Sequence, residues 1–147
     1  MSQRLGQFPR ITVRNLQRKM AVNVPDLQQF AWRAAAACLD LPGKTKTDLA
    51  KLSEVSIFVI SDQRMASLHR RFMNESGPTD VITFQHGEIF ISAATAHGNA
   101  KRFGNSFRRE LRRYVVHGLL HLHGFDDRDA ASARKMRSAE EKILNKL

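Results

Sequence analysis

Two short apolar segments near the middle of the chain constrain the fold most. Residues 81–84 (VITF) and 88–91 (EIFI) are rich in β-branched and aromatic side chains, which favour strands. Only Gln85, His86 and Gly87 separate them. So short a connection joins antiparallel strands, because parallel strands need a crossover of about a dozen residues or more. The chain is therefore expected to contain an antiparallel hairpin.

Strand and helix patterns alternate before the hairpin, and helix patterns alone follow it. Residues 11–16 and 55–60 have strand patterns. Helices are expected from about 25 to the Pro42 stop, from 61 or 62 to the loop beginning at 74, from 92 over a short alanine-rich stretch, from 105 or 106 to about 123, and from 128 to 144. This order predicts an α/β (α+β) fold in one domain over residues 1–147. Its small mixed four-stranded sheet, with one antiparallel hairpin, packs against about five helices.

One expected helix carries two histidines in an apolar segment. His117 and His121 are four residues apart, so on a helix both imidazoles project from one face and can bind one metal ion. Gly124 can end this helix in a left-handed conformation, and Asp126 and Asp127 follow it. The spacing His-x3-His-x2-Gly-x2-Asp predicts three ligands and an open position for water, which is typical of catalytic sites. The alternative is two core histidines bonded to carbonyls, with Asp126 or Asp127 capping the last helix.

Neighbouring residues narrow the chemistry. Gly118 stands where zinc peptidases of the His-Glu-x-x-His type carry a general-base glutamate, which disfavours peptide hydrolysis. His123 faces elsewhere on the helix, so we do not expect it to be a ligand. His69, His86 and His97 lack a partner at metal-binding spacing and are expected in surface or loop positions.

The charge of the chain favours a polyanionic partner. The sequence has 24 Lys and Arg against 14 Asp and Glu, a formal net charge of +10. Nucleic acid is favoured over anionic lipid or a merely solvated basic surface. No apolar run approaches the roughly 20 residues of a membrane-spanning helix. The single cysteine, Cys38, and the lack of a secretory signal pattern in the first ten residues predict the cytoplasm.

Several segments resemble the bacterial YbeY family. Residues 117–127 resemble the signature H-G-x-L-H-L-x-G-Y-D-H, residues 78–84 resemble P-T-[DN]-V-L-S-F, and residues 88–92 resemble the strand G-[DE]-I-x-I-S. Residues 109–111 match the start of the metal-binding helix of the family. The order and spacing of these blocks agree from about residue 11 to the end of the chain.

The resemblance implies a metal-dependent endoribonuclease specific for single strands. It implies work in 16S ribosomal RNA maturation and ribosome quality control, with ribosomal RNA and the small ribosomal subunit as partners and no membrane. One divalent ion, expected to be Zn²⁺, would be held by His117, His121 and Asp127. The alternative is a non-catalytic ribosome-assembly factor that keeps the metal for folding.

Two positions depart from the family pattern. Asp127 stands in place of a histidine, and its negative charge makes bound water less acidic and the site more tolerant of harder ions. Met73 stands in place of an arginine, and a thioether cannot neutralise a phosphate, so weaker catalysis is expected unless another cation substitutes. Arg113 lies on the same helical row as His117, and we hypothesise that it partly replaces the missing arginine. Arg71 is the other candidate.

Further residues are expected at the RNA-binding rim. Arg70, Arg109, Thr79 and Asp80 are candidate RNA-binding residues, although Thr79 and Asp80 could equally serve a turn. Asp126 is expected to cap the last helix, with proton transfer or orientation of a ligand histidine as its other role. The alternative for the arginines at positions 108, 109, 112 and 113 is a solvated basic face.

Overall fold

The computed structural model describes residues 8–73 and 79–147. Its elements are β1 (Arg10–Asn15), α2 (Val24–Leu39), α3 (Asp48–Lys51), β2 (Glu54–Ile60), α4 (Asp62–Met73), β3 (Val81–Phe84), β4 (Glu88–Ser92), α5 (Ala93–Phe103), α6 (Phe107–Leu122) and α7 (Ala130–Lys146). All the expected strands and helices form. The four-residue helix α3, capped by the Thr47 side chain, was not expected.

The strands form one mixed sheet in the order β1-β2-β4-β3. β1 pairs with β2 and β2 with β4 in parallel, whereas β3 and β4 are antiparallel. The predicted hairpin and mixed sheet are therefore confirmed. Gly87 has a φ of 113° in the hairpin connection, and a Cβ there would lie 2.6 Å from the carbonyl oxygen of Glu54. Only glycine fits this position without a shift of the backbone.

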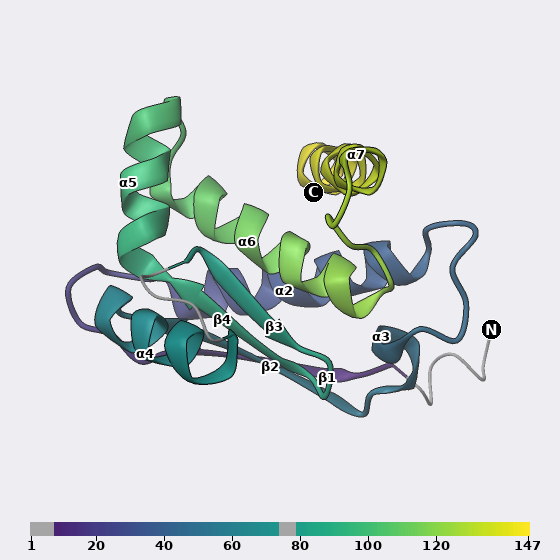
Figure 1. The fold of residues 1–147 in the computed structure, drawn as a ribbon, viewed down its shortest axis with the longest axis horizontal. Coiled ribbons are helices and arrows are strands. Elements are labelled where there is room, and N and C mark those ends of the chain that lie inside the picture. The colour runs from purple at the N-terminus through teal and green to yellow at the C-terminus, as the bar shows by residue number, and fades with distance from the viewer. Residues whose placement is uncertain (1–7, 74–78) are drawn as a thin grey trace.

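Helices cover both faces of the sheet (Figure 1). α2 and α6 lie on one face, where they bury the inward side chains of the parallel strands, such as Val55, Ile57 and Ile89, in the main core. Ile60 and Ile82 point to the opposite face and pack with Met65 of α4 in a smaller core. α7 packs on α6 on the side away from the sheet. No helix within residues 8–73 and 79–147 is long and apolar enough to cross a membrane.

Helix α6 begins and ends at the predicted signals. The Ser106 side chain accepts a hydrogen bond from the backbone N–H of Arg109, as expected of a cap. At the other end, Gly124 has a φ of 90°, and the N–H of Phe125 donates to the carbonyl of Leu120 at 3.0 Å. With the bond from Gly124 N–H to the His121 carbonyl, this is a Schellman motif. The chain reverses here, and the predicted left-handed glycine is confirmed.

Gly118 allows α6 to lie close to the sheet. A Cβ on this residue would be 2.6 Å from Cγ2 of Ile89 on β4, closer than two carbon atoms can approach. Position 118 thus faces the packed core, where a glutamate would have no room.

The expected cap of the last helix was wrong. Asp129, rather than Asp126 or Asp127, caps α7 by accepting a hydrogen bond from the N–H of Ser132 at 2.8 Å. Asp126 instead accepts a hydrogen bond from the N–H of Arg128, two residues further on, at 3.2 Å. The reversal at the end of α6 places Asp126 three residues before the cap position, so its carboxylate serves a local turn.

Candidate metal centre

Three predicted ligand side chains come together at the C-terminal end of α6. His117, His121 and Asp127 each offer one ligand atom, and these atoms lie within 4.8 Å of one another. Nε2 of His117 is 3.9 Å from Oδ2 of Asp127, and the two imidazole centroids are 4.8 Å apart. Two donors on one ion with bonds of about 2.0–2.2 Å can be at most about 4.4 Å apart. The group is thus close to ligating geometry, and the exposed Asp127 side chain is able to rotate towards the histidines.

The donor chemistry fits a divalent cation. Two imidazoles and one carboxylate form a mixed nitrogen and oxygen set of the kind that zinc and similar ions accept. Three protein ligands leave a coordination position for water or substrate. The group of residues is therefore suited to a catalytic ion, which needs an open position.

A buried carboxylate orients the first histidine. Oε2 of Glu140, on α7, lies 2.5 Å from Nδ1 of His117. A carboxylate only accepts, so Nδ1 carries the proton and Nε2 keeps its lone pair for a metal ion. Sequence reasoning missed Glu140. Its signal was a carboxylate in the buried stripe of α7 that also contains Met136 and Ile143.

The two histidines differ in their affinity for protons. Burial alone disfavours the imidazolium of His117, but the hydrogen bond and charge of Glu140, with Asp80 and Asp127, raise the pKa of His117 above its ordinary value. Burial and the neighbouring His117 lower the pKa of His121, which Asp127 only partly offsets. His121 is thus the more readily neutral of the pair.

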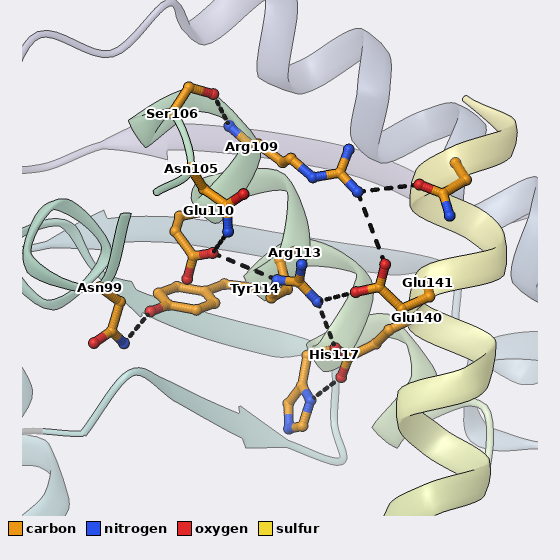
Figure 2. A network of polar contacts seen from close by, with 11 residues as sticks. Asn99, Asn105, Ser106, Arg109, Glu110, Arg113, Tyr114, His117, Glu140 and Glu141 are labelled. Atoms are coloured by element: carbon orange, nitrogen blue, oxygen red, sulfur yellow. Dashed lines mark hydrogen bonds and ion pairs between the residues drawn. The ribbon is translucent and has the colours of Figure 1, made fainter. Parts of the chain in front are cut away.

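Arg113 is held in a network of carboxylates (Figure 2). Its Nη1 lies 2.6 Å from Oε1 of Glu141 and 3.7 Å from Oε1 of Glu140, while its Nε lies 3.4 Å from Oε1 of Glu110. Arg113 also lines a cavity with His117, as the expectation that it leans towards the metal site requires. Its positive charge, however, is matched by three carboxylates.

The other arginines of α6 are paired rather than merely solvated. Arg108 and Arg112 both contact Asp26 of α2, at 2.8 and 3.3 Å. Arg109 lies 3.8 Å from Glu141 of α7. The alternative of a merely solvated basic face therefore does not describe these residues, because the arginines form ion pairs that join α6 to α2 and α7.

Two cavities lie beside His117, His121 and Asp127, which we call the metal group. The first, the α6–α7 cavity, measures about 230 Å³, and its lining includes His117, Asp127, Asp80, Arg113 and Arg137. Because His117 and Asp127 line it directly, a ligand in this cavity would lie next to the group.

The second, the β3 cavity, measures about 270 Å³ and is lined by His121, Thr79, Thr83 and His69, among others. His69 lies on α4 rather than in a loop and is half-buried where it lines this cavity. Since His121 lines this cavity and His117 the other, the metal group lies between the two. Thr79 and Asp80, the predicted cleft residues, line one cavity each.

The remaining predicted residues lie on α4. Arg70 and Arg71 are exposed, and the guanidinium of Arg71 lies 5.5 Å from the ring centroid of Phe72. Met73 is the last residue of α4, and its side chain lies outside the described part of the structure. Residues 74–78 also lie outside the described part, and they include Pro78, the first residue of the segment that resembles P-T-[DN]-V-L-S-F.

Three histidines lie apart from the metal group. His123 is buried, and its Nδ1 forms a hydrogen bond with Oγ1 of Thr47 at 2.9 Å. His86 is in the hairpin connection, 2.8 Å from a carboxylate oxygen of Glu88, and His97 is exposed on α5. These positions agree with the expectation that none of them joins His117 and His121.

Comparisons with known proteins identify relatives over most of the chain. A family model described as "Endoribonuclease YbeY" matches residues 12–147. A protein named Endoribonuclease YbeY from Phocaeicola vulgatus is 31% identical over 134 residues, covering 84% of this chain and 91% of the relative. A protein of the same name from Heliobacterium modesticaldum is 30% identical over 154 residues, with 87% and 90% covered. The solution structure of TM1509 from Thermotoga maritima matches with a TM-score of 0.60 at 23% identity, covering 92% of this chain and 90% of that one, and so supports the fold.

Proposed function

The chain belongs to the YbeY family of endoribonucleases, and from this membership we propose that it hydrolyses single-stranded RNA in the maturation of 16S ribosomal RNA and in ribosome quality control. Its class is that of the metal-dependent hydrolases. The single observation that carries the proposal is the convergence of His117, His121 and Asp127, whose ligand atoms lie within 4.8 Å of one another between two cavities.

The proposed cofactor is one Zn²⁺ ion held by His117, His121 and Asp127. When bound, such an ion would supply Lewis-acid chemistry, stabilising the charge that develops on the phosphate and on the attacking water. Asp127 in place of a third histidine adds a negative charge to the site, so manganese and other harder ions are expected to support activity as well.

The protein's own residues hold the ligands in position. Glu140 accepts a hydrogen bond from Nδ1–H of His117 and thereby fixes the ring so that Nε2 faces Asp127, 3.9 Å away. Arg113 lies 3.7 Å from the other oxygen of Glu140, and this contact helps to hold the carboxylate beside His117. Arg113 is thus better placed to support the metal ligands than to contact RNA.

Basic residues are proposed to bind the RNA backbone without reading its sequence. The net charge of +10 supports this, and Arg70 is an exposed cation on α4. Thr79 and Asp80 border the cavities next to the metal ligands. Arg109 is also proposed to contact the RNA backbone, although it lies 3.8 Å from the carboxylate of Glu141. Affinity should fall steeply with added salt, because each phosphate contact releases counterions.

The proposed setting is the cytoplasm, with ribosomal RNA and the small ribosomal subunit as partners and the chain acting as a single domain. The basic composition supports a polyanionic partner, and the lone, buried Cys38 suits a reducing compartment.

A cleavage assay tests the proposal. Protein stripped with a chelator is incubated with labelled single-stranded RNA, with and without added zinc or manganese, beside an Asp127→Ala variant. We expect cleavage by the wild type to return with the metal and to fall at least tenfold in the variant. RNA binding without any metal-dependent cleavage by the wild type would contradict the proposal and support a non-catalytic assembly factor.

A further inference from the structure

The α6–α7 cavity contains two arginines with different surroundings, and we propose that Arg137 makes this cavity a binding subsite for one phosphate group of the RNA, next to the metal ligands. The inference rests on the proposed function, because the ligand is a phosphodiester of its substrate. It assigns the phosphate contact to α7, not to Arg113.

The positive charge of Arg113 is neutralised by neighbouring carboxylates, so Arg113 attracts an anion only weakly. Its side chain is 24% exposed, and its guanidinium lies 2.6–3.7 Å from carboxylate oxygens of Glu110, Glu140 and Glu141. A phosphate approaching Arg113 would meet three negative charges around one positive charge, two of them within one turn of α7. The local balance therefore repels an anion.

Arg137 differs from Arg113 in its exposure and in its lack of a carboxylate partner among the described residues. It is exposed on α7, and its side chain lines the cavity together with His117 and Asp127. Within residues 8–73 and 79–147, no carboxylate forms an ion pair with its guanidinium. A guanidinium presents several N–H donors in one plane and binds phosphate oxygens in pairs. Its charge is thus available at the edge of the cavity that contains two of the metal ligands.

Three carboxylates also face this cavity, and they limit where an anion can bind. Glu140 accepts a hydrogen bond from His117, and Asp127 is one of the three proposed metal ligands. Asp80 accepts a hydrogen bond from the N–H of Val81 at 2.8 Å, so its charge is partly satisfied by the backbone. Since Asp80 still opposes an anion, the phosphate should lie on the α7 side of the cavity. A diester with one negative charge is repelled less than a dianionic phosphate.

The size of the cavity agrees with a single phosphate. Its volume of about 230 Å³ is below the several hundred cubic ångströms of pockets that enclose a drug-sized ligand. One phosphate and part of its ribose would fill it, while the strand continues past the metal ligands towards the β3 cavity.

The chain provides a matched control for the test. Arg134 lies three residues before Arg137 on α7 and is also exposed, but it does not line the cavity. Arg137→Gln and Arg134→Gln therefore remove the same charge from the same helix, one inside and one outside the proposed subsite. The readouts are kcat/KM on single-stranded RNA as a function of potassium chloride concentration, metal content, and the melting temperature of the metal-loaded protein.

We expect Arg137→Gln to lower kcat/KM roughly tenfold at low salt and to reduce the slope of log kcat/KM against log salt by about 0.7, the loss of one single-strand phosphate contact. Metal content and melting temperature should not change, and Arg137→Lys should retain most of the salt slope. Arg134→Gln should stay within about twofold of the wild type.

Equal effects of the two glutamine variants would overturn the inference, because general attraction would then explain both. So would a loss of bound metal in Arg137→Gln, which would make Arg137 a structural residue. Failure of the wild type itself to cleave RNA is a separate outcome, and it would refute the proposed function rather than this subsite alone.

Discussion

Glu140 of α7 accepts a hydrogen bond from His117 of α6, with Oε2 2.5 Å from Nδ1 (Figure 2). This contact joins a proposed metal ligand to a helix that supplies none of the three proposed ligands. The orientation of His117 therefore depends on how α7 packs against α6, and a change in α7 can alter metal binding without touching a ligand.

Glu140→Gln should weaken metal binding by about tenfold to a hundredfold, because an amide holds the Nδ1 proton less strongly and can present its own N–H instead. The measurement is a competition titration of metal-free protein against a chromophoric zinc chelator.

Glu141→Gln is the matched control. Glu141 is the adjacent residue and lies 2.6 Å from Arg113, but it does not contact His117. Equal losses of zinc affinity in the two variants would show that the effect of Glu140 arises from the arginine network and not from its bond to His117.

Gly118→Ala should destabilise the fold by about 1–3 kcal/mol through overpacking. The added methyl group would meet Cγ2 of Ile89 at 2.6 Å and Cδ1 at 2.9 Å. Urea unfolding measures the loss. Combined with Ile89→Ala, the loss should be smaller than the sum of the two single losses, because the space left by Ile89 accommodates the methyl group. Strict additivity would mean that Gly118 has another role.

Local signals explain why so much of the fold could be predicted. The hairpin followed from the three residues between residues 81–84 and 88–91, and the left-handed Gly124 followed from its place after an apolar helix. Turn chemistry and periodicity act within a few residues, so a sequence displays them directly. α3 was missed because four residues are too few to show a helical period.

Long-range packing explains what could not be predicted. Glu140 is 23 residues from His117, and only the packing of α7 on α6 brings them together. The same packing surrounds Arg113 with carboxylates, which its helical row alone did not reveal. The candidate pair His117 and His121 was visible in the sequence because both lie on one helix, whereas Glu140, which orients His117, lies on another.

Asp26→Asn should destabilise the protein by about 1 kcal/mol at pH 7, a solvent-screened value, and by less in acid. The hydrogen bond from Arg108, together with the charge of Arg112, lowers the pKa of Asp26 from 3.8 to about 2, against the opposing effect of burial. A lowered pKa means stabilisation that is fully present above about pH 4 and lost as the pH falls towards 2. Urea unfolding at pH 7 and pH 3 should show the difference between the two proteins narrowing. A difference that does not change with pH would exclude an ionic origin.

Cys38 should be inert towards thiol reagents while the protein is folded. It is fully buried, and this burial raises the pKa of its thiol to about 12, so the reactive thiolate is scarce. Labelling with a disulfide reagent should be slow in buffer and stoichiometric in urea. Fast labelling of the folded chain would show that the core around α2 opens readily.

Direct titration of zinc into metal-free protein tests the central claim, that His117, His121 and Asp127 bind one ion together. The account predicts one ion per wild-type chain and at least a hundredfold weaker binding in His121→Ala. Circular dichroism should show that both metal-free proteins are folded. Zinc binding by folded His121→Ala with the affinity and stoichiometry of the wild type would contradict it.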